Sequence, residues 1–98
     1  MRPGTRYKSQ VCTTEVIVVR AADVVLSCGG HPMIELNDAA APGLRPDSGF
    51  VAGTQLGKRY TDPDGVLEVL VTKPGTGSLS LGAEPLTIRS AAALPSSD

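Results

Sequence analysis

The sequence predicts an all-β fold built from two tandem β-hairpin repeats, and three observations support this. The 98-residue chain contains eleven glycines and eight prolines, so turns are frequent and long helices are disfavoured. Its aliphatic residues alternate with polar ones in short segments, as in half-buried strands. Residues 4–33 and 57–86 also resemble each other in ungapped register, 53 residues apart. Since aromatic residues make up only 3% of the chain, valine, leucine, isoleucine and alanine must supply the core.

The repeat is the strongest signal. Ten of the thirty aligned positions are identical, whereas unrelated segments of ordinary composition agree at roughly two. The identical pairs are Gly4/Gly57, Arg6/Arg59, Tyr7/Tyr60, Glu15/Glu68, Val16/Val69, Val18/Val71, Leu26/Leu79, Ser27/Ser80, Gly29/Gly82 and Pro32/Pro85. Because no gap interrupts the alignment, every turn keeps its length, and the two segments are predicted to be copies of one unit.

Each copy is expected to form a β-hairpin with an entering and a leaving arm. The first hairpin strands are expected at residues 14–20 and 67–73, where β-branched residues and leucine are concentrated. Period two places Val16 and Val18 on one face of the first strand, and Val69 and Val71 on the matching face of the second. The elements expected next are turns at 21–23 and 74–77, second strands at 24–28 and 78–81, and short strands at 33–36 and 86–89.

A single domain, residues 1–98, is expected, because a chain of this length buries only one modest core. Within it we expect repeat 1 at 4–36, a connector at 37–56, repeat 2 at 57–89 and a flexible tail at 90–98. One hairpin cannot bury its apolar face alone. The two repeats are therefore expected to pack as a pseudo-two-fold small sandwich or open barrel.

Charge and hydropathy disfavour several classes of protein. The net charge is −1 and no basic run or aromatic platform occurs, so nucleic-acid binding is not expected. No apolar run approaches the ~20 residues that span a membrane. The polar N-terminal segment lacks the apolar stretch of a secretory signal, which makes a cytoplasmic location the expectation.

The first copy resembles the desulforedoxin family, whose fold also forms the N-terminal domain of desulfoferrodoxin. The resemblance is carried by Tyr7–Cys12, Val16–Val18 and Leu26–Met33. The family pattern is Tyr-Lys-Cys-x-x-Cys, a hairpin, and then Leu-x-Cys-Cys-Gly-x-x-Met, with four thiolates holding one iron. Here Ser9 and Gly29 replace two of those thiolates, and only Cys12 and Cys28 remain. The matching positions of the second copy are Asp62, Gly65, Leu81 and Gly82. A tetrathiolate iron site within one chain is thereby excluded.

The resemblance implies that Cys12 and Cys28 converge, with their sulfurs roughly 3.8 Å apart, beside His31. Three interpretations stay open: an open site for Zn²⁺, Fe²⁺ or Cu⁺ with His31 as a third ligand, a redox-active or disulfide pair, or two small buried hydrophobic residues left at an old metal site. His31, the only histidine, is alternatively an exposed turn residue.

No catalytic constellation is visible, so the chain is not expected to be an enzyme. Residues 62–65 and 74–77 are interpreted as turns rather than calcium or phosphate loops. The repeated Arg6 and Arg59 are expected to pair with Glu15 and Glu68. We expect a small non-catalytic accessory or scaffold protein without a cofactor, which binds another protein through a sheet edge or the connector. The alternative is a zinc- or iron-binding or redox protein that uses Cys12 and Cys28. Homo-oligomerisation is left open.

Overall fold

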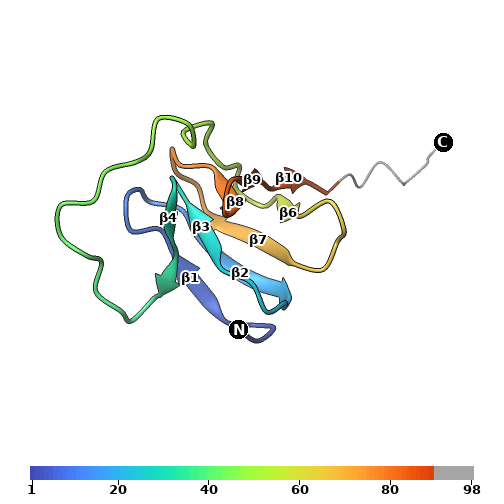
Figure 1. Cartoon of the computed structure of the whole chain (residues 1–98). Helices are drawn as coiled ribbons and strands as arrows, with labels where there is room; N and C mark the ends of the chain where they lie inside the picture. Colours follow the sequence, from blue (N-terminus) through green and yellow to red (C-terminus); the bar gives the residue numbers. More distant parts are fainter. Residues whose placement is uncertain (90–98) are drawn as a thin grey trace.

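The computed structural model describes residues 1–89, and these fold into ten β-strands and no helix (Figure 1). The strands are β1 (Arg6–Lys8), β2 (Glu15–Arg20), β3 (Leu26–Cys28), β4 (His31–Pro32), β5 (Ile34–Glu35), β6 (Arg59–Thr61), β7 (Glu68–Lys73), β8 (Leu79–Leu81), β9 (Glu84–Pro85) and β10 (Thr87–Ile88). The predicted all-β class is confirmed. The predicted flexible tail lies outside the described residues. No helix among residues 1–89 is long and apolar enough to cross a membrane.

The strands form two antiparallel sheets rather than a closed barrel. The six-stranded sheet has the order β10-β6-β7-β2-β1-β5, and the four-stranded sheet has the order β4-β3-β8-β9. The middle of each sheet is therefore a pair of strands from opposite halves of the chain, β2 with β7 and β3 with β8. Neither half contains a complete sheet, so the fold requires both.

The two middle pairs are antiparallel, and the β2–β7 pair has register shifts between Glu15 and Val16 and between Val18 and Arg20. In the six-stranded sheet Ile17 lies opposite Leu70, and in the four-stranded sheet Ser27 lies opposite Ser80. Both partners are 53 residues apart in the sequence. Flanking pairs also match, since Val16 faces Val71 and Val18 faces Val69.

Backbone hydrogen bonds outside the ladders repeat with the same spacing. The amide of Gly4 donates to the Val18 carbonyl at 2.7 Å, and the amide of Gly57 donates to the Val71 carbonyl at 2.9 Å. Met33 donates to Leu26 at 2.8 Å, as Leu86 does to Leu79 at 2.9 Å. Each strand of the first half also has a counterpart 53 residues later with the same length.

The core draws its apolar side chains from both sheets. Its fully or nearly fully buried members are Val16, Val18, Leu26, Cys28, Met33, Tyr60, Leu67, Val69, Val71, Leu79 and Leu86. The valines predicted to face inward from the first strand of each copy are all buried. Period two along the strands is thus a correct guide to the buried face.

Two expected elements differ from the structure in detail. The second strands begin at Leu26 and Leu79, two residues and one residue later than predicted. The short strand expected at 33–36 is preceded by a separate two-residue strand, β4, because the turn at Gly29 and Gly30 reverses the chain at once. In strands of two or three residues, apolar and polar residues alternate too few times for the pattern to show where the strand begins and ends.

The connector, residues 37–56, packs across one end of the sheets. Asp47 donates its amide to the Gly29 carbonyl at 2.8 Å, and Phe50 accepts from the amide of Ser78 at 2.8 Å. In Figure 1 the connector runs around this end of the molecule between β5 and β6. Its path brings it against both the turn after β3 and the loop before β8.

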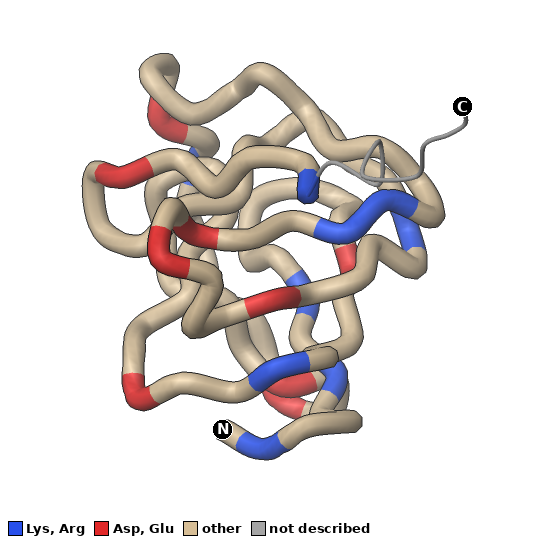
Figure 2. The backbone as a smooth tube through the Cα atoms, turned by 90° about the vertical axis from the view of Figure 1, so that its right-hand side faces the viewer, with Lys and Arg blue, Asp and Glu red and all other residues tan. Residues whose placement is uncertain are grey.

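Acidic and basic residues are distributed over several segments of the backbone. Figure 2 shows both signs of charge on one side of the molecule, separated by stretches without charge. This distribution matches the net charge of −1.

Candidate functional site

The loop between β1 and β2 holds Cys12 in place through Ser9. The Ser9 hydroxyl accepts hydrogen bonds from the amides of Val11 and Cys12, both at 3.1 Å. The Ser9 amide donates to the Thr14 carbonyl at 2.9 Å, which closes the loop. A serine side chain that accepts backbone amides two and three residues later is a standard turn device. Ser9 therefore has a local structural role in this loop.

Cys28 ends β3 and is 0% exposed. It enters a two-residue hairpin turn at Gly29 and Gly30, whose φ values of 66° and 85° are both positive. Such turns favour glycine, since other residues are strained at positive φ. A Cβ atom on Gly29 would also lie 2.5 Å from the Val11 side chain. Glycine at this position lets the Cys12 loop approach Cys28.

The two sulfur atoms lie 3.8 Å apart. The predicted proximity of Cys12 and Cys28 is confirmed, and both are free thiols. A disulfide bond is about 2.05 Å long, so the sulfurs need to approach by less than 2 Å to form one. The pair is therefore close enough for direct thiol–disulfide chemistry.

The loop of residues 74–77 from the second half covers the thiol pair. The amide of Gly77 donates to the sulfur of Cys12 at 3.4 Å. A Cβ atom on Gly77 would lie 2.9 Å from the Cys28 sulfur, and one on Gly75 would lie 2.9 Å from the Cys12 sulfur. Neither glycine has a positive φ, so close approach to the sulfurs, rather than backbone conformation, requires glycine here. The sequence pattern identified this loop as a turn and missed its contact with the cysteines.

The hydroxyls of Thr14 and Thr54 form a series of contacts that leads from the sulfur of Cys12 to the connector. Thr14, which is 0% exposed, places its Oγ1 atom 3.3 Å from the Cys12 sulfur and 3.0 Å from Oγ1 of Thr54. The Thr54 hydroxyl accepts from the amide of Gly75 at 3.0 Å and lies 3.4 Å from the Gly75 carbonyl oxygen. A continuous chain of hydroxyls thus joins the sulfur to the loop that covers it.

The two thiols differ in acidity. Burial alone would raise the pKa of the Cys12 thiol. Hydrogen bonds with the side chains of Ser9 and Thr14, and with the backbone of Thr14 and Gly77, outweigh burial and lower this pKa from 9.0 to about 7. Burial, together with the neighbouring charge of Cys12, raises the pKa of the Cys28 thiol from 9.0 to about 12. Cys12 is therefore the first of the two thiols to lose its proton as the pH rises.

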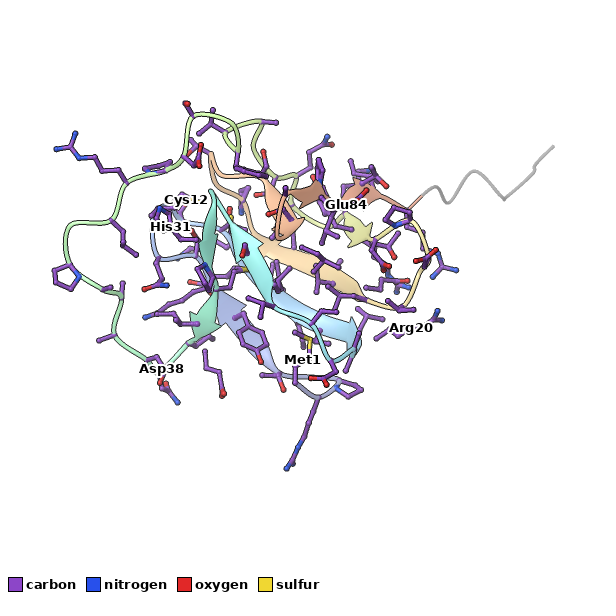
Figure 3. All side chains as sticks on the ribbon, viewed as in Figure 1. Met1, Cys12, Arg20, His31, Asp38 and Glu84 are labelled. Atoms are coloured by element: carbon purple, nitrogen blue, oxygen red, sulfur yellow. The ribbon has the colours of Figure 1, made fainter. Side chains whose placement is uncertain are left out.

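His31 does not join the thiol pair. Its Nε2 atom lies 2.8 Å from the carbonyl oxygen of Arg45, so that nitrogen carries a proton and donates to the connector. Figure 3 shows Cys12 and His31 at the same end of the molecule. Within residues 1–89, however, no three histidine, cysteine or acidic side chains are gathered around one point. The alternative in which His31 is a third metal ligand beside Cys12 and Cys28 stays a prediction, and the contact that the structure shows for the imidazole is the one with Arg45.

A tetrathiolate metal centre does not fit these residues. Ser9 already accepts two backbone amides, and Gly29 has no side chain. The remaining donors are two thiols and neutral hydroxyls, and a neutral oxygen is a poor ligand for a thiophilic ion. The geometry instead provides a partly accessible thiol of low pKa in contact with a buried one.

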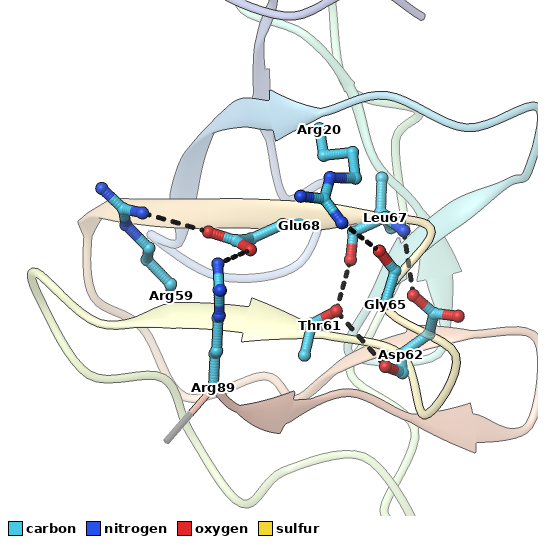
Figure 4. A network of polar contacts seen from close by, with 8 residues as sticks. All are labelled: Arg20, Arg59, Thr61, Asp62, Gly65, Leu67, Glu68 and Arg89. Atoms are coloured by element: carbon cyan, nitrogen blue, oxygen red, sulfur yellow. Dashed lines mark hydrogen bonds and ion pairs between the residues drawn. The ribbon is translucent and has the colours of Figure 1, made fainter. Parts of the chain in front are cut away.

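The matching end of the second half contains no sulfur. The Asp62 carboxylate accepts from the amide of Leu67 at 2.9 Å, and the amide of Gly65 donates to the Asp62 carbonyl at 3.0 Å, which confirms the predicted turn (Figure 4). Backbone hydrogen bonds to the Asp62 carboxylate, that from Leu67 above all, lower the pKa of this carboxyl. Arg20 donates to the Gly65 carbonyl at 2.9 Å.

The repeated acidic residues have different partners. Glu68 is buried and pairs with Arg59 at 3.3 Å, as predicted, and with Arg89 at 2.7 Å (Figure 4). Glu15 pairs with Lys73 at 3.7 Å, not with Arg6 as predicted. The antiparallel register places Glu15 directly opposite Lys73 across the β2–β7 pair, whereas the sequence repeat indicates only equivalent positions and not cross-strand neighbours.

Comparisons with protein-family models, curated proteins and solved structures find no match to this chain.

Proposed function

We propose that this chain is a small non-catalytic thiol module in which Cys12 and Cys28 interconvert between a dithiol and a disulfide. The observation that carries the proposal is the 3.8 Å separation of the two sulfurs. The low pKa of Cys12 supports it, because the thiolate is the reactive form in disulfide exchange. The cysteines were expected either to bind a metal or to undergo redox chemistry. Two neighbouring thiols are sufficient for redox chemistry, whereas a metal site needs further ligands.

The reaction balances with an organic disulfide as the oxidant. Oxidation removes two electrons and two protons from the two thiols and forms one S–S bond between them. The organic disulfide accepts the electrons, its own S–S bond breaks, and it leaves as two thiols. The reverse reaction uses two molecules of the same thiol as the reductant.

Glutathione redox buffers test this proposal on the full-length protein. We expect both thiols to disappear together as the proportion of glutathione disulfide rises, with the loss of two hydrogen atoms in the intact mass. Cys12→Ser and Cys28→Ser should each prevent the internal bond. Persistence of two free thiols at high glutathione disulfide contradicts the proposal. Stoichiometric zinc or iron in the untagged protein, lost in either variant, would favour the metal-binding alternative instead.

The accessory role, in which the chain binds another protein, is a second proposal. Its support is the connector, which exposes Val51 by 48% and Leu56 by 62%. The buried core of an interface between two proteins is rich in apolar side chains, and Val51 and Leu56 are the exposed aliphatic side chains that the connector offers for such a contact. The double variant Val51→Ser/Leu56→Ser should lose proteins that co-purify with the native chain. Val25→Ser is the control, since Val25 is equally exposed but lies outside the connector. Unchanged co-purification would contradict this role.

For the fold, we propose an internal duplication with approximate two-fold symmetry, similar to the desulforedoxin arrangement of paired units. A two-fold axis requires that residues on it pair with their own equivalents. The pairs Ile17 with Leu70 and Ser27 with Ser80 meet this requirement, one in each sheet. An experimental structure tests the proposal. Residues 4–36 should superimpose on 57–89 by a rotation near 180°, and a rotation far from this value would exclude the symmetry.

A further inference from the structure

We propose that Cys12 is the entering thiol of the pair, that Cys28 is the resolving thiol, and that Thr14 and Thr54 are positioning residues for Cys12. This inference rests on the proposed dithiol–disulfide function and assigns a separate role to each side chain. The substrate class is a low-molecular-weight organic disulfide. Three features of the structure support the inference: the different exposure of the two cysteines, the hydrogen bonds around the Cys12 sulfur, and the hydrogen bonds that link the hydroxyls of Thr14 and Thr54.

Access separates the two sulfurs. Cys28 is 0% exposed and lies under Gly77, whose backbone leaves no room for even one additional carbon atom near that sulfur. Cys12 is only partly buried. Gly75 lies as close to the Cys12 sulfur as Gly77 does to the Cys28 sulfur, so the difference in access rests on the partial exposure of residue Cys12, and we assign the first contact with an external disulfide to Cys12. Such an arrangement favours attack by Cys12 and protects Cys28 from external reagents.

Hydrogen-bond donors are gathered around Cys12. The Gly77 amide donates to its sulfur at 3.4 Å, and the Thr14 hydroxyl is 3.3 Å away. Hydrogen bonds to a charged group are stronger than those between neutral groups, so the Gly77 amide stabilises the thiolate more than the thiol. In the structure the Cys12 thiol donates to the Thr14 hydroxyl, which becomes a second donor to the sulfur once it turns its own proton toward the thiolate. These donors come from the first half and the second half of the chain, so the assembled fold, not the loop alone, creates the site.

The hydroxyl chain can reverse its direction when Cys12 loses its proton. In the thiol form, Cys12 donates to Thr14, Thr14 donates to Thr54, and Thr54 donates to the Gly75 carbonyl oxygen at 3.4 Å. In the thiolate form, Thr54 donates to Thr14, and Thr14 donates to the sulfur. The Thr54 oxygen still accepts from the Gly75 amide at 3.0 Å. Every hydroxyl keeps a donor and an acceptor role in both forms, so ionisation leaves no buried hydroxyl without a partner.

The exchange then proceeds in two steps. The Cys12 thiolate attacks one sulfur of the organic disulfide, whose S–S bond breaks and releases one thiolate. The product is a mixed disulfide on Cys12. Cys28 loses its proton, which reaches the released thiolate through solvent, and the new Cys28 thiolate attacks the sulfur of Cys12. The internal disulfide forms and the second external thiolate leaves.

Glutathione disulfide and intact-mass measurement test the order of attack. Cys28→Ser should accumulate a glutathione adduct on Cys12, because no resolving thiol is present. Cys12→Ser should form no adduct on the buried Cys28 under the same conditions. An adduct that forms mainly on Cys28 would overturn the assigned order, while the dithiol function would stand if the native chain still forms the internal disulfide.

The threonine assignment is tested by adduct formation in the Cys28→Ser protein at neutral pH. Thr14→Val removes the hydroxyl but keeps the shape, and should slow the adduct roughly threefold for each tenfold loss of thiolate, because a more basic thiolate is also more nucleophilic. The ultraviolet absorbance of the thiolate should fall as well. Thr14→Ser should restore both values. Thr54→Val should act in the same direction with a smaller effect.

Thr13→Val is the matched control. Thr13 is adjacent to Thr14 in the sequence, but its hydroxyl donates to the Pro74 carbonyl at 2.7 Å and not to a sulfur. Its substitution should leave the adduct rate and the thiolate absorbance unchanged. Thermal unfolding confirms that each variant is folded at the temperature of measurement. Equal rates in Thr14→Val and the parent protein, or failure of Thr14→Ser to restore the rate, would overturn the role of Thr14.

Discussion

The loop after β1 and the loop after β6 occupy equivalent positions in the two halves of the chain. Each loop contains a side chain that accepts backbone amides, but the two loops enclose different buried side chains. In the first half, Ser9 accepts two amides, and the neighbouring buried side chain is Thr14. In the second half, Asp62 accepts the amide of Leu67, which is itself buried. The same loop frame thus closes over either a polar or an apolar side chain. The fold therefore does not require a threonine at position 14. The interaction that is specific to Thr14 is the contact between its hydroxyl and the Cys12 sulfur.

The largest expected difference between the two ends concerns Leu67 and Thr14. Leu67→Ala should lower the free energy of unfolding by about 2–5 kcal/mol, because it leaves a cavity in the shared core. Thr14→Val keeps the volume and loses only hydrogen bonds, so a loss on the order of 1 kcal/mol is expected. Urea denaturation measures both. Equal losses would mean that the hydroxyl is as important for stability as the leucine side chain.

The two central strands should respond alike, in contrast to the two ends. Val18 and Val71 are both buried and belong to one core. Val18→Ala and Val71→Ala should each lower the free energy of unfolding by about 1–3 kcal/mol. Denaturation curves of the two variants provide the measurement. If one variant unfolds like the native protein, the two halves do not share one core at that position.

The repeated glutamates should differ. Glu68 is buried and bonded to two arginines, whereas Glu15 has one partner, Lys73, in a more exposed pair. Glu68→Gln should lower the free energy of unfolding by about 1–2 kcal/mol through loss of charge-assisted hydrogen bonds. Glu15→Gln should change it by less than about 1 kcal/mol. The reverse ranking in chemical denaturation would contradict the buried network.

The smallest expected difference between the two loops is in how the free energy of unfolding depends on pH. The folded state lowers the pKa of the Asp62 carboxyl below 3.8, so this group stabilises the fold above that value. Its contribution is lost as the pH falls through the lower pKa of the folded state. Asp62→Asn should therefore lose less stability between neutral and acidic pH than the native protein. Ser9→Ala, which alters the matching uncharged position, should leave the acid dependence unchanged. Denaturation at several pH values distinguishes the two.

Period two and the repeat were sufficient to predict the all-β class and the buried valines of β2 and β7, because these depend on local alternation. The proximity of Cys12 and Cys28 followed from the family resemblance rather than from spacing. The sequence did not predict the contacts of Thr14 with Thr54, of Gly77 with Cys12, or of Glu15 with Lys73. Each joins segments 40 or more residues apart, and the register that brings them together is a property of the assembled sheets.

His31 shows the limit of reasoning from spacing. Its position three residues after Cys28 is compatible with a shared ligand site, and the two-residue turn between them makes the residues cross-strand partners. The imidazole then reaches the Arg45 carbonyl in the connector. The course of the connector, which has no periodic pattern, could not be derived from the sequence.

The connector has a kinetic consequence. Because it ties together two halves that complete each other's sheets, their meeting is intramolecular, and its rate does not depend on protein concentration. Residues 37–43 are exposed and can be cleaved without cutting a strand. After such cleavage the two fragments would have to find each other by diffusion. The stability of the fold, and with it the assembly of the site from Cys12, Thr54 and Gly77, would then depend on dilution.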